Sequence, residues 1–108
     1  MDGSLETNRR LRQVAETISR ESVIKAIADL MLNHVADIGY LEKQSASESS
    51  EQQERIRQDI KMDEKAIFAL IKVAADLELY EDVNGRIIIP KRIKEAYWGP
   101  EHPNAHLP

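Results

Sequence analysis

Between Val23 and Ile38 apolar residues recur every three or four positions, and this spacing limits the fold of the chain more than any other feature. They cover so much of a helix circumference that we expect this helix to be central and buried on most sides. Ser22 is expected to cap its start, and Gly39 to end it in the left-handed conformation. The apolar residues are Val23, Ile24, Ile27, Ala28, Leu30, Met31, Val35 and Ile38.

An earlier helix with one buried stripe is expected over residues 5–20, because apolar residues repeat there at helical spacing. The stripe consists of Leu11, Val14, Ala15 and Ile18. After the central helix, residues 42–53 read EKQSASESSEQQ, a polar composition that is typical of a surface loop or mobile link.

Two further helices are expected between this loop and Leu79. Ser50 and Gln53 have the spacing of a capping box, which predicts a short helix that is anchored by Ile56 and Ile60 and ends near Lys61. Asp63 is then expected to cap a longer helix. Its predicted inward residues are Ala66, Ile67, Leu70, Ile71, Ala74 and Leu77, with Phe68 and Leu79 widening the apolar face.

The segment LYEDVNGRIIIPKRI, residues 79–93, predicts a β-hairpin. Asn84 and Gly85 suit the centre of a type I′ turn, which requires positive φ at both residues. The β-branched run from Ile87 to Ile89 favours a strand, and Pro90 would close it because proline lacks a ladder N–H donor. The sequence thus predicts one domain over residues 1–98, followed by an extended or disordered tail over residues 99–108.

Composition restricts the classes of function. The chain has 108 residues and a formal net charge of -4, so any attraction to nucleic acid must be local. It contains no cysteine, which excludes disulfides and thiolate chemistry and favours an intracellular location. No signal peptide or membrane span is visible, so we expect a cytoplasmic protein without membrane association.

The block from Ile56 to Ile93 resembles the winged helix-turn-helix pattern, in which two helices are followed by a β-wing. It is similar to the small dimeric DNA-binding proteins of the ArsR and TubR types. The resemblance implies a mainly α fold with a small β-hairpin and an additional N-terminal helix. It also implies a homodimer that binds double-stranded DNA by occupancy, as a transcriptional regulator or a plasmid- or virus-type site binder.

Basic residues are clustered on the elements that this resemblance would bring to DNA. Lysines and arginines there would contact phosphates, and two lysines of the second motif helix would face the groove. The expected DNA-binding residues are Arg55, Arg57, Lys61, Lys65, Lys72, Arg86, Lys91 and Arg92. The alternatives are that these charges only solvate the surface, or that the winged-helix module contacts a protein partner without binding DNA.

No catalytic or cofactor site is expected. The sequence has no GxxxxGK, GxGxxG or GxSxG motif, and no paired acid and base is evident. His34 is expected to be a hydrogen-bonded core or interface residue, while His102 and His106 lack the fixed geometry of metal ligands. Tyr97 and Trp98 are expected to pack on a partner subunit or on the first helix.

Overall fold

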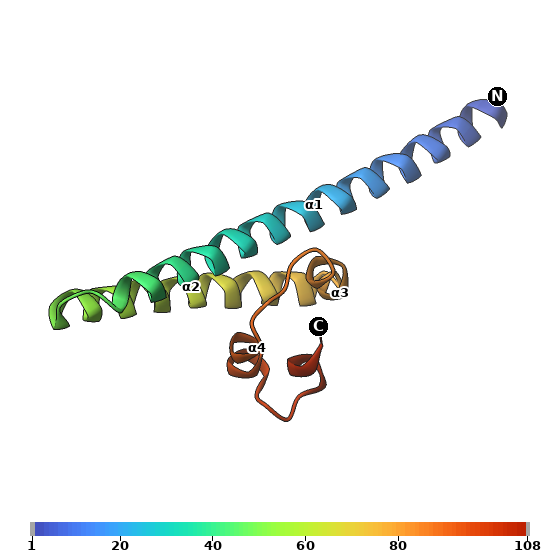
Figure 1. Cartoon of the computed structure of the whole chain (residues 1–108). Helices are drawn as coiled ribbons and strands as arrows, with labels where there is room; N and C mark the ends of the chain where they lie inside the picture. The colour runs from blue at the N-terminus through green and yellow to red at the C-terminus, as the bar shows by residue number, and fades with distance from the viewer. Residues whose placement is uncertain (1, 108) are drawn as a thin grey trace.

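A computed structural model describes residues 2–107, without the side chains of residues 2–5, 15, 17 and 18. The elements are α1 (Asp2–Ser45), α2 (Ser50–Asp76), α3 (Tyr80–Asn84), α4 (Lys91–Trp98) and the 3-10 helix η1 (Pro103–His106). Helices α1 and α2 form a long antiparallel hairpin, and α3, α4 and η1 lie on one side of it (Figure 1). The N-terminal part of α1 runs past the other elements as a projecting arm (Figure 1), so the molecule measures 73 Å in its longest dimension and 17 Å in its shortest.

The expected β-hairpin, and with it the winged helix-turn-helix fold, is wrong. No strand occurs among residues 2–107, and residues 80–84 form the short helix α3. Gly85 has φ -64° and ψ -19°, a right-handed conformation that a type I′ turn excludes. Tyr80 and Val83 are both buried by one helical turn, whereas an isolated two-stranded ribbon is marginally stable.

The isoleucine run after α3 is extended but unpaired. Ile87 and Ile89 are buried, whereas Ile88 between them is 85% exposed. This alternation is that of a strand. The segment therefore buries two isoleucines against the helices although no second strand among the described residues pairs with it. For this reason the β-branched run suggested a hairpin strand that is not formed.

The predicted division of the N-terminal half into two helices is also wrong, because α1 continues from Asp2 to Ser45. Ser22 and Gly39 both lie in its interior. An exposed helix tolerates either residue, since glycine costs only about 1 kcal/mol relative to alanine and serine less. The connection between the helices comprises only residues 46–49, so most of the loop expected over residues 42–53 is helical. The predicted burial of the first stripe is wrong for Leu11 and Val14, which are exposed, while Ala15 and Ile18 fall outside the described side chains.

Helix α2 likewise replaces two predicted helices. It passes Lys61 and Asp63 without interruption, because no glycine or proline occurs between Ser50 and Asp76. Asp63 does not cap a helix; its Oδ1 lies 2.8 Å from His34 Nδ1 of α1. The hydrogen-bonded histidine expected at position 34 is therefore confirmed, at a partly buried site.

Helix α2 ends in a Schellman motif. The Leu79 N–H donates to the Ala74 carbonyl at 2.7 Å, and the Glu78 N–H donates to the Ala75 carbonyl at 3.0 Å. Glu78 occupies the left-handed position at φ 57°, where glycine is usual. This reversal turns the chain into α3.

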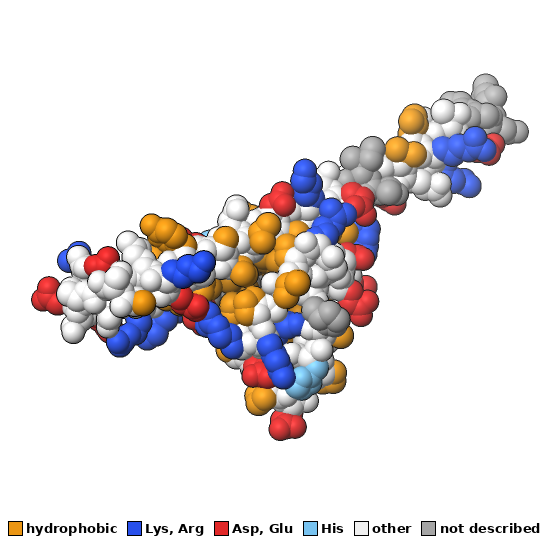
Figure 2. Space-filling model, viewed as in Figure 1, with side chains coloured by type: hydrophobic (Ala, Val, Ile, Leu, Met, Phe, Trp, Pro, Cys, Tyr) orange, Lys and Arg blue, Asp and Glu red, His pale blue; other side chains and the backbone are white. Residues whose placement is uncertain are grey.

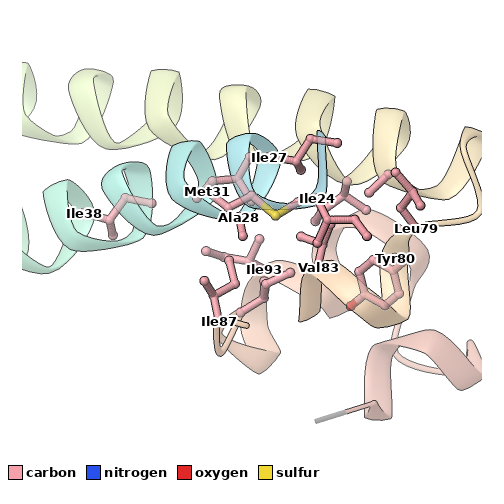
Figure 3. Close-up of a cluster of buried hydrophobic side chains, with 14 residues drawn as sticks. Ile24, Ile27, Ala28, Met31, Ile38, Leu79, Tyr80, Val83, Ile87 and Ile93 are labelled. Atoms are coloured by element: carbon pink, nitrogen blue, oxygen red, sulfur yellow. The ribbon is translucent and has the colours of Figure 1, made fainter. Parts of the chain in front are cut away.

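The core joins the hairpin to the C-terminal elements. Side chains of α1 converge on those of α3, of the extended segment and of α4 (Figure 3). The buried cluster is Ile24, Ile27, Ala28, Met31, Ile38, Ile67, Ile71, Ala74, Leu79, Tyr80, Val83, Ile87, Ile89 and Ile93. The central helix is thus buried along one stripe only, since Val23 and Leu30 are 39% and 49% exposed.

Residues 99–107 fold back onto the domain, which differs from the extended tail that was expected. Ala105 in η1 is fully buried, and Lys94 Nζ donates a hydrogen bond to the Leu107 carbonyl. Tyr97 contacts Phe68 of α2 with ring centroids 5.7 Å apart, and Trp98 contacts Tyr80 at 4.8 Å. These aromatic side chains therefore find partners within their own chain, on α2 and α3 rather than on α1.

Candidate interaction surfaces

The structure does not gather the eight predicted DNA-binding residues on one surface. Five of them form ion pairs with carboxylates of the same chain. The pairs are Arg57 with Glu54 at 3.2 Å, Lys72 with Asp76 at 3.0 Å, Arg86 with Glu21 at 2.5 Å, Lys91 with Glu95 at 3.7 Å, and Arg92 with Glu42 at 2.5 Å. Their charges are largely balanced before any phosphate approaches.

Two of these pairs hold the C-terminal elements on α1. Arg86 follows α3 and reaches Glu21 of α1, while Arg92 in the first turn of α4 reaches both Glu42 of α1 and Glu64 of α2. Arg20 makes a third such bridge, to Asp82 at 2.5 Å. These partly exposed pairs add little stability one by one; they connect α1 to α3, to the segment that follows α3 and to α4, which the buried cluster also joins to the hairpin.

Arg55, Lys61 and Lys65 remain as exposed basic residues of α2. They do not belong to a helix-turn-helix, because α2 is a single helix there. Lys61 and Lys65 lie one turn apart, so together they form a short basic edge along α2.

The exposed hydrophobic residues of the hairpin are grouped more clearly than the predicted DNA-binding residues. Ten large hydrophobic side chains are exposed in the described part of the chain. Nine of them lie along two faces of the helical hairpin, and only Ile88 lies elsewhere. Scattered exposed hydrophobic residues are normal in proteins, whereas continuous apolar faces mark binding surfaces.

The hairpin face runs along the groove between α1 and α2, on the side carrying the His34–Asp63 contact. Leu30 lies one turn from His34, and Leu70 lies two turns from Asp63, so both leucines lie on the side of the groove that carries this contact. Two turns further along each helix come Val23 and Leu77. We define the hairpin face by its exposed members Val23, Leu30, Met62, Val73 and Leu77, of which Leu77 is 52% and Met62 69% exposed.

The outer stripe lies on the side of α1 that points away from α2. Leu11, Val14, Leu32 and Tyr40 are 62%, 56%, 50% and 65% exposed, and exposed Ala36 lies between the last two. Lys25 and Asp29 occupy the same side of the helix in the middle of the stripe. Figure 2 shows that the stripe begins on the projecting arm, where hydrophobic side chains are fully on the surface.

A polar cluster closes one end of the hairpin face. The pKa of Asp37 is raised by hydrogen bonding to Asp63, by local desolvation and by the nearby charges of Asp63 and Asp59, while His34 acts in the opposite direction. The cluster unites two acidic residues of α2 with His34 and Asp37 of α1. Within residues 2–107 no group of three or more acidic, histidine or cysteine side chains has the arrangement of a metal site.

Reasoning from the sequence missed both faces. The signal on α2 was present, because Met62, Ala66, Ala69 and Val73 follow a spacing of four, three and four residues, which is typical of a helix–helix seam. It was hidden by the assumption that α2 breaks near Met62 and that Leu77 points inward.

Comparison with protein-family models, with curated proteins and with solved structures finds no match to this chain. None of the helices formed by residues 2–107 has the length and apolar character required to cross a bilayer.

Proposed function

We propose that this protein is a non-enzymatic helical interaction module, whose hairpin face binds a helix of a partner protein. The observation that carries the proposal is that five of the ten exposed large hydrophobic side chains of the described residues lie on the hairpin face. A groove between two antiparallel helices accepts a third helix through apolar residues at three- and four-residue spacing.

The edges of the hairpin face indicate the chemistry of the bound helix. Lys61 and Lys65 are exposed beside Met62 and have no ion-pair partner among the described residues. A partner helix with an apolar stripe and carboxylates on the flank next to these lysines would complement both features.

This proposal accounts for the surface better than DNA binding does. Most of the predicted phosphate contacts are already paired with carboxylates, and the net charge of -4 opposes long-range attraction to a polyanion. Among the predicted DNA-binding residues, Arg55, Lys61 and Lys65 are those without an ion-pair partner among the described residues.

A displayed library of helical peptides, selected on the purified protein and followed by fluorescence anisotropy, tests the proposal. We expect selected peptides to combine an apolar stripe with flanking Asp or Glu. Leu77→Glu should weaken their binding about tenfold to a hundredfold, because burial of one such side chain contributes roughly 1.5–3 kcal/mol. Ile88→Glu is the matched control, since Ile88 is exposed off both faces.

The proposal fails if the library yields no binder, or if Leu77→Glu and Ile88→Glu bind the selected peptides equally well. Duplex DNA is titrated in parallel at several salt concentrations. Salt-dependent binding that disappears in the Lys61→Ala, Lys65→Ala double variant would favour the nucleic-acid function instead.

A further inference from the structure

The projecting arm lacks what normally stabilises a helix. Helix α1 has 44 residues and is thus about 66 Å long. Its first buried side chain among the described residues is Ile24, and Figure 1 shows α1 extending beyond α2 and α3 on the N-terminal side of this region. Most helical stability in proteins comes from tertiary packing of an apolar face, and a surface that covers Leu11 and Val14 would supply this packing to the arm.

Two charged residues interrupt the outer stripe at its centre. Lys25 and Asp29 are exposed, and neither forms an ion pair with a described residue. Both lie on the side of α1 that carries Leu32 and Ala36. A helix that covers the stripe must therefore contact a positive charge and, one turn further along α1, a negative charge. The chemistry of the covering helix is therefore an apolar stripe with an acidic and a basic residue one turn apart.

Helix α1 itself has this pattern when it runs in the opposite direction. If two copies pair antiparallel with Lys25 level with Asp29 of the partner subunit, the symmetry repeats the contact in reverse, and two ion pairs form. The same register sets Val14 level with Tyr40 of the partner subunit, and Leu32 level with Ser22 of the partner subunit. In this way each arm is covered by the C-terminal half of the other α1.

Other arrangements of the same stripe are less favourable. Parallel pairing places like charges side by side at positions 25 and 29, which is destabilising. Shifting the antiparallel register by one heptad sets Lys25 against Ala36 of the partner subunit and Asp29 against Leu32 of the partner subunit, which leaves both charges without a partner in an apolar seam. Charge complementarity thus selects both the direction and the register.

We infer that the outer stripe is a self-association surface, through which two copies of this chain pair α1 with α1 in antiparallel orientation around Lys25 and Asp29. The inference goes beyond the proposed function, because it concerns a different face of α1 and a second copy rather than another protein. Disruption of the hairpin face should leave it intact, so the two proposals can fail separately.

Cross-linking measures direction and register together. The chain contains no cysteine, so introduced thiols are unique. Val14→Cys and Tyr40→Cys proteins are treated with a short bis-maleimide, separately and as a mixture. We expect covalent dimers of twice 12.3 kDa mainly in the mixture, since identical positions lie about 39 Å apart along an antiparallel pair. Ile88→Cys serves as a control for random collision.

Charge reversal tests the contact at the centre. In sedimentation equilibrium, Lys25→Asp should weaken dimerisation about tenfold or more, because it sets two acidic pairs face to face. Adding Asp29→Lys should restore wild-type affinity, while Leu77→Glu on the hairpin face should leave it unchanged. Circular dichroism checks that each variant remains helical.

Three results would overturn the inference. The wild-type protein remaining a monomer up to about 100 μM would do so, as would cross-linking of Val14→Cys with itself, which indicates parallel pairing. Failure of Asp29→Lys to rescue Lys25→Asp would show that these side chains do not meet.

Discussion

Replacing Gly39 with alanine should stabilise this protein, because Gly39 lies inside α1 and not at its end. A Cβ added at this position meets no atom within 4 Å, so alanine introduces no clash. Alanine is about 1 kcal/mol more favourable than glycine in a helix interior. For a domain of this size a gain of about 1 kcal/mol raises the melting temperature by roughly 4–8 °C.

The same substitution at Gly99 provides the matched control. Gly99 has φ 93°, a conformation that alanine rarely adopts, although the space around it is equally free. We expect Gly99→Ala to lower the free energy of unfolding by about 1–2 kcal/mol. Both variants are compared with the wild type by urea denaturation followed by circular dichroism, at one protein concentration and with the m-value checked for constancy.

A loss of stability in Gly39→Ala would refute the reasoning. That outcome is expected if Gly39 terminates a helix in the left-handed conformation, in which case both glycine variants would be destabilised together.

Three further predictions concern the core and its titrating groups. Burial raises the pKa of Tyr80 to about 12, so as the pH rises this hydroxyl ionises in the unfolded chain before it does so in the folded protein. The free energy of unfolding, measured by denaturant titration, should therefore fall between pH 10 and pH 12, and Tyr80→Phe should lack this decline. Because the pKa of Asp37 is raised above 3.8, its contribution to stability is present below that pH and is lost as the pH rises through the folded-state pKa. Asp37→Asn should therefore be more stable than wild type at pH 7 and equal to it below pH 3.8, and an unchanged pH profile would argue against the acidic cluster. Ile71→Ala should cost about 2–5 kcal/mol at a fully buried site, whereas Ile88→Ala should stay within about 0.5 kcal/mol in the same urea assay; similar losses in both would contradict the assigned core.

Helical periodicity allowed much of the core to be predicted from sequence. The apolar residues expected at the centre of α1 include Ile24, Ile27 and Met31, which are buried, and Ile67 and Ile71 of α2 are fully buried. Periodicity reports burial because residues three and four apart share a helix face. It does not report how far a helix continues.

The helix ends were mispredicted because capping residues are local and weak signals. Ser22 and Asp63 have side chains that suit N-caps, yet each lies within a longer helix whose packing outweighs a contribution of about 1 kcal/mol. The type I′ turn predicted at Asn84 and Gly85 was also wrong, because this signal too is local. A hairpin there needed a second strand to pair with, whereas α3 buries Tyr80 and Val83 against α1.

The candidate site could not be read from sequence, since it depends on pairs far apart in the chain. Arg86 finds Glu21 and Arg92 finds Glu42 only after the chain has folded, and these contacts convert apparent phosphate ligands into internal ion pairs. The hairpin face depends on the long-range pairing of α1 with α2, to which the His34–Asp63 contact belongs.

Both proposed surfaces require α1 to be one continuous helix. The distance between two spin labels on the same chain, measured by double electron–electron resonance, tests this directly. Spin labels are placed by Arg9→Cys and Asn33→Cys in a protein diluted with unlabelled chains, so that only distances within one chain are measured. An unbroken helix predicts a narrow distribution around 36 Å between the backbone positions. A broad distribution, or a distance below about 25 Å, would show that the helix breaks between these residues and would contradict the account.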